Sequence, residues 1–194
     1  MSALAPGPYY RTAFIVSVIA LSCAFALSDL RLDTWNALLP FFEWMETSLF
    51  GVIGKTWGAA FAIVEAFHLM AMALLGGAVL VSDGRLLGVL LTGLPSKLVL
   101  DNAHKIFLIG LGIMILTGIF MACGVAMKIY YLNVYWYKML ALTVGIVFVF
   151  FVKRPLFANG SENVQPWITR LAAISSLMIW FTVAATGRWI GFSG

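Results

Sequence analysis

The sequence predicts an all-α integral membrane protein, a single domain of about five transmembrane helices with an additional amphipathic helix at the membrane surface. Two observations carry this prediction. The 194 residues are 62% hydrophobic and 10% charged, with a mean hydropathy of +1.00. The apolar residues are also gathered into stretches of about 20 residues, the length that crosses a hydrocarbon layer of about 30 Å as a helix. Together they exclude an ordinary water-soluble domain.

Five stretches meet the spanning length. They are Tyr10 to Leu30, Trp57 to Val81, Ala103 to Met127, Val134 to Val152 and Trp167 to Trp189. Backbone groups find no water in lipid, so each stretch is expected to be a helix. Glycines in such helices belong where two helices approach closely, which makes Gly76, Gly77, Gly110 and Gly118 the expected contact points.

Two connecting stretches are more apolar than simple loops. In Trp35 to Phe50, the apolar side chains fall roughly on one helical face and Glu43 and Glu46 on another, which suits a helix lying on the bilayer. Arg85 to Asp101 is interrupted by glycines and by Pro95 before it could span. We expect it to extend the second helix and then to form an interfacial turn.

Basic residues indicate partners and orientation. Lysines and arginines occur singly or in pairs between apolar stretches, which indicates interfacial anchors in a lipid bilayer and no nucleic-acid partner. On one side lie Arg11, Arg85, Lys97, Lys105, Lys153, Arg154 and Arg170, and on the other Arg31, Lys55, Lys128, Lys138 and Arg188. This excess places the N-terminus in the cytoplasm.

Polar side chains inside a predicted span are the first candidates for a functional site. His68 lies near the middle of the second span, and Glu65 and Met72 share its helical face because they are three and four residues away. A carboxylate, an imidazole and a thioether are therefore expected to point into one region of the bundle.

The carboxylate-x-x-histidine spacing recurs at Asp101 and His104. Metal sites in helical bundles use this spacing together with further glutamates, and no such glutamates occur inside the spans. His68 with Glu65 is therefore only a weak candidate for a metal site. No P-loop, G-x-S-x-G or H-E-x-x-H motif occurs, so a hydrolase is not supported and enzymatic activity stays open.

A b-type haem is the leading interpretation of His68, because imidazole ligates haem iron and apolar helices can house a flat macrocycle. His104 is the candidate second ligand, although the depths disagree. His68 lies about 20 Å from the end of its span, whereas His104 lies about 3 Å from the start of the next. Three alternatives follow from this disagreement. The third helix could start before Ala103 and bring His104 deeper, a methionine such as Met114 or Met121 could replace His104 as the ligand, or no haem binds.

Arg188 lies near the end of the last span, in the half of the membrane that holds Glu65. It is expected to pair with Glu65, to neutralise a haem propionate, or to anchor the helix beside Trp189. The competing function is a non-catalytic anchor or assembly subunit of a larger complex, or a small-solute transporter. In that case Glu65 and His68 form a buried hydrogen-bonded pair or move protons.

Three segments together resemble a known group of proteins: FFEWMETSLFG, IVEAFHLMAMALLGGAVLVSDGRLLG and SSLMIWFTVAATGRWIGF. They are similar to small bacterial inner-membrane proteins with five helices, a family classed only as a domain of unknown function. The resemblance runs from about Phe41 onward, is clearest at His68 and at Gly187 to Trp189, and leaves out the first span. It implies a multi-pass protein of the bacterial inner membrane and supplies no reaction. A larger membrane complex or a homo-oligomer is the expected assembly.

Overall fold

The structure is a computed structural model that describes residues 17, 20, 24, 28 and 30–193. The chain divides into two compact units, residues 1–41 and residues 42–194. The predicted first span, Tyr10 to Leu30, lies almost entirely outside the described residues. The described part of the smaller unit is chiefly the beginning of helix α2 (Leu30–Thr47), which continues into the larger unit.

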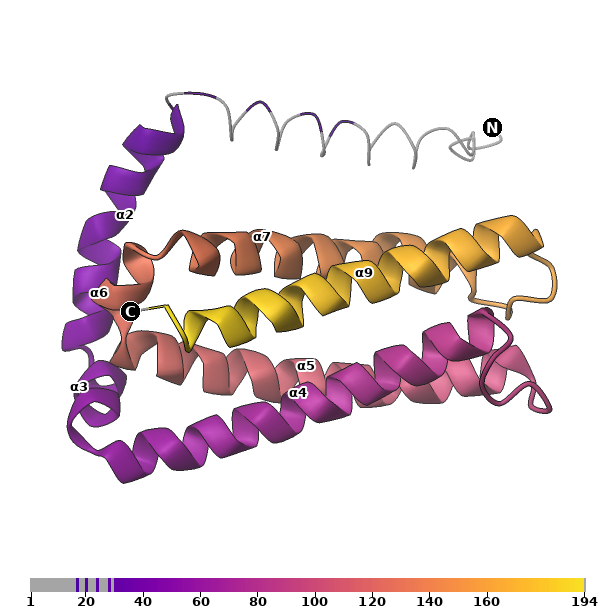
Figure 1. Cartoon of the computed structure of the whole chain (residues 1–194), viewed down its shortest axis with the longest axis horizontal. Helices are drawn as coiled ribbons and strands as arrows, with labels where there is room; N and C mark the ends of the chain where they lie inside the picture. Colours follow the sequence, from indigo (N-terminus) through magenta and orange to yellow (C-terminus); the bar gives the residue numbers. More distant parts are fainter. Residues whose placement is uncertain (1–16, 18–19, 21–23, 25–27, 29, 194) are drawn as a thin grey trace, which may run out of the picture. The chain divides into compact units, whose positions relative to one another are not determined.

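The larger unit is an all-α bundle of long apolar helices (Figure 1). Four helical segments of the described residues are long and apolar enough to cross a membrane. These are α4 (Gly58–Leu86), α5 (Ser96–Gly124), a composite of α7 (Asn133–Val147) with η1 (Phe148–Lys153) and α8 (Arg154–Leu156), and α9 (Pro166–Ile190). The prediction of an all-α membrane protein is thereby confirmed.

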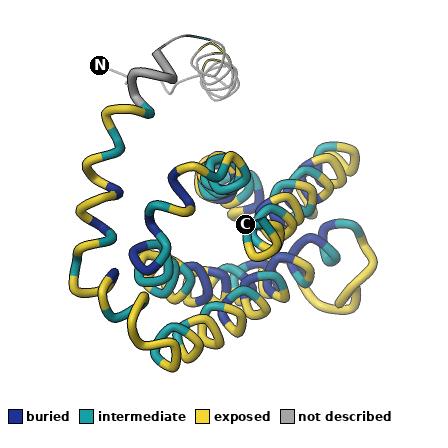
Figure 2. The backbone as a smooth tube through the Cα atoms, turned by 60° about the vertical axis from the view of Figure 1, so that its left-hand side comes forward, coloured by how far each residue is buried: buried dark blue, intermediate teal, exposed yellow. Residues whose placement is uncertain are grey.

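The four segments run alternately up and down, because short connections join consecutive helices at opposite ends of the bundle (Figure 1). Helix α4 packs against α5 and α9, and α9 packs against α7. Figure 2 shows that the buried residues lie on the inner sides of the helices and that much of the outer surface is exposed. In a membrane protein these outer surfaces face lipid.

Small residues allow the closest contacts. A Cβ atom added at Gly110 would lie 3.2 Å from the Leu75 backbone nitrogen, and one at Gly118 would lie 3.4 Å from His68 Cε1. The expectation of close approach is confirmed at these two glycines. It is wrong for Gly76 and Gly77, which face open space because they lie on the side of α4 turned away from its neighbours.

The predicted amphipathic helix, Trp35 to Phe50, is two helices in the structure. Helix α2 ends at Thr47, and α3 (Leu49–Thr56) begins after Ser48, whose hydroxyl oxygen accepts a hydrogen bond of 3.2 Å from the Gly51 backbone N–H. This N-cap starts a new helix in the middle of the predicted one. Phe42 is buried and its ring lies 5.3 Å from that of Tyr130, whereas Phe41 is exposed.

The third span begins earlier than predicted. Helix α4 does extend to Leu86 and is followed by a turn, as expected, but α5 begins at Ser96 and not at Ala103. Pro95 precedes α5 directly and fixes its start, since proline cannot lie within a helix without losing a backbone hydrogen bond. The Glu162 side chain accepts a hydrogen bond of 3.2 Å from the Ser96 N–H and so satisfies a free donor at the first turn.

Candidate functional site

Helix α4 brings Glu65, His68 and Met72 to the wall of one cavity, as their spacing predicts. The cavity has a volume of about 350 Å³ and lies among α4, α5, α7 and α9. We call it the His68 cavity. Its wall is apolar at Phe61, Leu69, Val183 and Ile190 and carries polar groups at a few points, which is the composition expected of a ligand pocket.

His68 is held from across the helix interface by Thr117 of α5. Its Nδ1 atom lies 2.8 Å from the Thr117 hydroxyl oxygen. That hydroxyl lies 2.7 Å from the Ile113 carbonyl oxygen, to which it donates its single hydrogen. When the Thr117 hydroxyl donates to Ile113, its oxygen accepts a hydrogen bond from Nδ1–H, and the neutral imidazole in that tautomer keeps its lone pair on Nε2.

Glu65 is not the hydrogen-bond partner of His68. Its side chain is exposed, and His68 bonds to Thr117 instead of the carboxylate, so the structure does not contain the hydrogen-bonded Glu65–His68 pair considered above. No group of three or more histidine, cysteine, aspartate or glutamate side chains that could hold a metal ion occurs within the described residues. Glu65 and His68 share a cavity but not a metal-binding cluster.

Basic side chains surround the same cavity. Arg188 and Lys128 line it, and the Lys138 side chain lies against Gly187, where an added Cβ atom would approach its Nζ to 3.6 Å. The Arg188 guanidinium lies 4.6 Å from the centre of the Phe192 ring. In the described part of the chain neither Lys138 nor Arg188 forms an ion pair, so an anionic ligand could use their charge.

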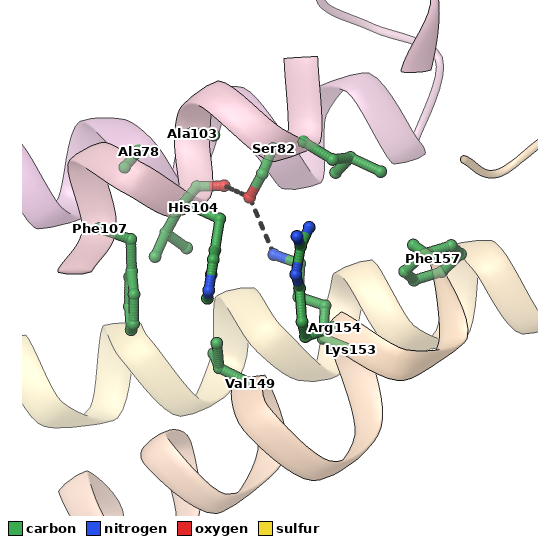
Figure 3. A pocket seen from close by; sticks show the side chains of 11 residues that line it. Ala78, Ser82, Ala103, His104, Phe107, Val149, Lys153, Arg154 and Phe157 are labelled. Atoms are coloured by element: carbon green, nitrogen blue, oxygen red, sulfur yellow. Dashed lines mark hydrogen bonds between the residues drawn. The ribbon is translucent and has the colours of Figure 1, made fainter. Parts of the chain in front are cut away.

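His104 lies in a second, smaller cavity at the other end of the bundle. We call it the His104 cavity, and its wall includes Ser82, Phe107, Lys153 and Arg154 (Figure 3). The His104 ring stacks on Phe107 with the ring centres 6.2 Å apart. Asp101, at the equivalent position to Glu65, forms ion pairs with Lys97 and Arg154 and is not directed to a shared ligand.

The two histidines are too far apart to share a ligand atom. Along α5 the distance from His104 to Thr117, the partner of His68, is about 20 Å at 1.5 Å per residue. A cluster of buried apolar side chains lies between the two cavities. This apolar layer consists of Leu75, Ala78, Val79, Phe107, Leu111, Val149, Trp180 and Val183.

Sequence reasoning missed four polar residues that matter to these sites. Thr117 contacts the His68 ring, Lys138 lines the His68 cavity, and Asp83 forms a buried ion pair with Lys153. The signal was present, because each of them is polar and lies in or beside an apolar stretch. The lysines served only to orient the chain, and Thr117 and Asp83 were given no role.

Comparison with known proteins places the chain in one group. The family model that matches it, over residues 41–193, is described as a family of unknown function (DUF6644). No curated protein and no solved structure matches the chain significantly.

Proposed function

This chain belongs to that family of unknown function, and from its own residues we propose that it is a membrane-embedded electron-transfer subunit that binds a b-type haem in the His68 cavity. The orientation of the His68 ring is the observation that carries the proposal. Thr117 contacts Nδ1, so Nε2 is the ring nitrogen left to ligate iron in the tautomer in which Nδ1 donates to Thr117. Histidine ligands in proteins commonly have their other ring nitrogen fixed in this way.

The second axial position has thioether candidates in the same cavity. Met114 and Met121 of α5 line its wall, and either thioether could supply the second ligand to the iron, whereas Met72 lies on the same face of α4 as His68 and could not reach the other side of the ring. His104 is not used in this proposal, because it lines the other cavity. His68 and His104 lie at different depths in the bundle and could not hold the same iron, whereas His68 and a methionine of the same cavity could.

The charge of the cavity wall also suits the group. A haem has an apolar ring and two propionates, and the wall combines apolar side chains with Lys128, Lys138 and Arg188 against one carboxylate, Glu65. Arg188 and Lys138 are the residues that would neutralise the propionates. When bound, the haem supplies one-electron redox chemistry, and the protein supplies ligands, charge and exclusion of water.

We place the protein in the bacterial inner membrane with its N-terminus in the cytoplasm. Arg85, Lys97, Lys153, Arg154 and Arg170 lie at one end of the bundle, which the positive-inside rule assigns to the cytoplasm. The His68 cavity then opens in the outer half of the membrane. Electrons would pass to a partner in a larger membrane complex or in a second copy of the chain.

The test is an absorption spectrum of the detergent-purified protein, oxidised and then reduced with dithionite, together with a pyridine haemochrome assay. We expect about one haem b per chain, lost in His68→Ala and retained in His104→Ala, since His104 lies outside the cavity. Met114→Leu and Met121→Leu identify the second ligand by which of them changes the reduced spectrum.

A folded, colourless protein from cells supplied with haem would contradict the proposal, as would equal haem content in His68→Ala. The alternative function, a non-catalytic anchor or assembly subunit or a small-solute transporter, would then be favoured. In that case the His68 cavity would hold lipid or solute.

A further inference from the structure

A second polar cluster, which the proposed haem site does not use, lies at the cytoplasmic end of the bundle in the orientation assigned above. Asp83 of α4 is fully buried and forms an ion pair with Lys153 of η1, whose side chain is 11% exposed. The Lys153 ammonium also donates to the Ser82 hydroxyl at 2.8 Å and lies 3.4 Å from the Ser176 hydroxyl. Its three hydrogens therefore all have partners.

The aspartate is less well satisfied than the lysine. Its Oδ1 accepts from Lys153, whereas Oδ2 is buried and has no hydrogen-bond partner among the described residues. An ionised carboxylate offers about four acceptor sites, and burying the charge with most of them empty is costly. Adding a proton to Asp83 removes that charge and leaves the Lys153 ammonium with the Ser82 and Ser176 hydroxyls as its remaining polar contacts.

The cluster borders a cavity through Lys153 and Ser82, although Asp83 itself does not line it. Lys153 and Ser82 line the His104 cavity, and Figure 3 shows His104 and Lys153 reaching into it from opposite helices. The cavity volume is about 40 Å³, which is room for about three or four water molecules at about 10 to 15 Å³ each. Lys153 is the last residue of a π-helical turn, a distortion often found at functional sites.

Several charged and polar groups surround the Asp83–Lys153 pair. Helix α5 contributes His104 and Asp101, α8 contributes Arg154, and α9 contributes only the Ser176 hydroxyl. Asp101 is already paired with Arg154 and Lys97. The Asp83 carboxylate therefore has one cation beside it, Lys153. Protonation of Asp83 would leave the positive charge of Lys153 unbalanced.

We infer that Asp83 and Lys153 form an internal proton-binding site that water reaches through the His104 cavity. One proton from a hydronium ion adds to the Asp83 carboxylate and forms an O–H bond, which leaves a water molecule behind. Lys153 stays an ammonium, and the pair changes from zero net charge to +1. The apolar layer blocks passage toward His68, so the proton enters and leaves from the same end of the bundle.

Infrared difference spectra of the full chain between alkaline and acidic solution test the site. We expect a carboxylic-acid C=O band that appears on acidification, is lost in Asp83→Asn and remains in Asp101→Asn, the control carboxylate. If Asp83→Asn does not fold, Asp83→Glu provides the test. It keeps a carboxylic acid at this position and should shift the frequency of its C=O band. Identical spectra in the wild type and in the folded variant would overturn the inference.

The water route has its own test in the same band. In deuterated water the band should shift as O–H becomes O–D, and Ala103→Leu should slow this shift because Ala103 is buried in the wall of the His104 cavity. Ala122→Leu is the control, since it lies on the same helix but lines the His68 cavity. A rate unchanged in Ala103→Leu, or reduced equally in both variants, would overturn the route.

Discussion

His68 and Thr117 lie on neighbouring antiparallel helices and are joined by a hydrogen bond of 2.8 Å between Nδ1 and Oγ1. The threonine hydroxyl also donates 2.7 Å to the carbonyl of Ile113, one turn earlier in α5. The contact holds the orientation of the imidazole, and a hydroxyl that gives its hydrogen to Ile113 also favours the tautomer in which Nδ1 donates to Thr117.

Replacing Thr117 with valine should weaken haem binding without abolishing it. The variant keeps the shape of the side chain and removes the acceptor, so the His68 ring loses its fixed tautomer. Loss of such a supporting partner typically lowers metal affinity by about 10-fold to 100-fold. The measurement is a haem titration of the apoprotein followed by absorbance. Thr143→Val is the control, because Thr143 is exposed and bonds only to its own helix.

Gly110→Val should destabilise the bundle, because a Cβ atom at this position meets Leu75 and the Ala71 carbonyl at 3.2 to 3.3 Å. Overpacking of this kind costs about 1 to 3 kcal/mol. The free energy of unfolding in mixed micelles measures the effect. Gly112→Val is the matched control on the same helix, since an added Cβ atom there has no neighbour within 4 Å. Equal losses in both variants would mean that helix propensity and not packing decides.

The sequence predicted the helices well and their contacts only in part. Hydropathy and length are local properties, so the four spans of the described residues could be located from them. Which face of a helix turns inward depends on its neighbours, so the same expectation of a contact was correct for Gly110 of α5 and wrong for Gly76 of α4. The start of α5 depends on Pro95 and on Glu162, which lies far along the chain.

In the candidate site, too, the sequence predicted what lies on one helix but not the contacts between helices. Glu65, His68 and Met72 were grouped correctly because their spacing on one helix is enough to place them together. Thr117 could not be assigned to His68 without knowing how α4 and α5 are aligned. A hydrogen bond between helices needs that register, and no residue pattern within one span encodes it.

Removing one partner of the Asp83–Lys153 pair should cost far more than removing both. Lys153→Met leaves the Asp83 carboxylate buried without a cation, and Asp83→Leu leaves the ammonium likewise, at a cost of about 3 to 5 kcal/mol each. The double variant replaces both by apolar groups and should recover much of this loss. A double-mutant cycle of unfolding free energies provides the measurement, and additive losses would argue against coupling within the pair.

Glu162→Gln should change how stability depends on pH. Hydrogen bonds from Ser96 lower the pKa of the Glu162 carboxyl below its ordinary value of 4.5. A lowered pKa in the folded state means that the ionised carboxylate favours folding above pH 4.5 and that this contribution is lost as the pH falls through the lowered value.

The Glu162→Gln variant should therefore be less stable than the wild type near neutral pH, and the difference should shrink below pH 4.5. Acid unfolding followed by circular dichroism measures it. Glu43→Gln is the control, because it removes an exposed carboxylate that does not bond to the start of α5. A difference that stays constant from neutral to acid pH would contradict this assignment.

The apolar layer between the two cavities also acts as an insulator. Because it holds no charged side chain, it should polarise less than the two cavities, whose walls carry charged groups, and a larger share of a transmembrane voltage should fall across it. A charge at Asp83 or beside Arg188 is then close to the potential of its own side of the membrane. Events in each cavity respond to the chemistry of one compartment, and only a charge that crosses the layer does electrical work.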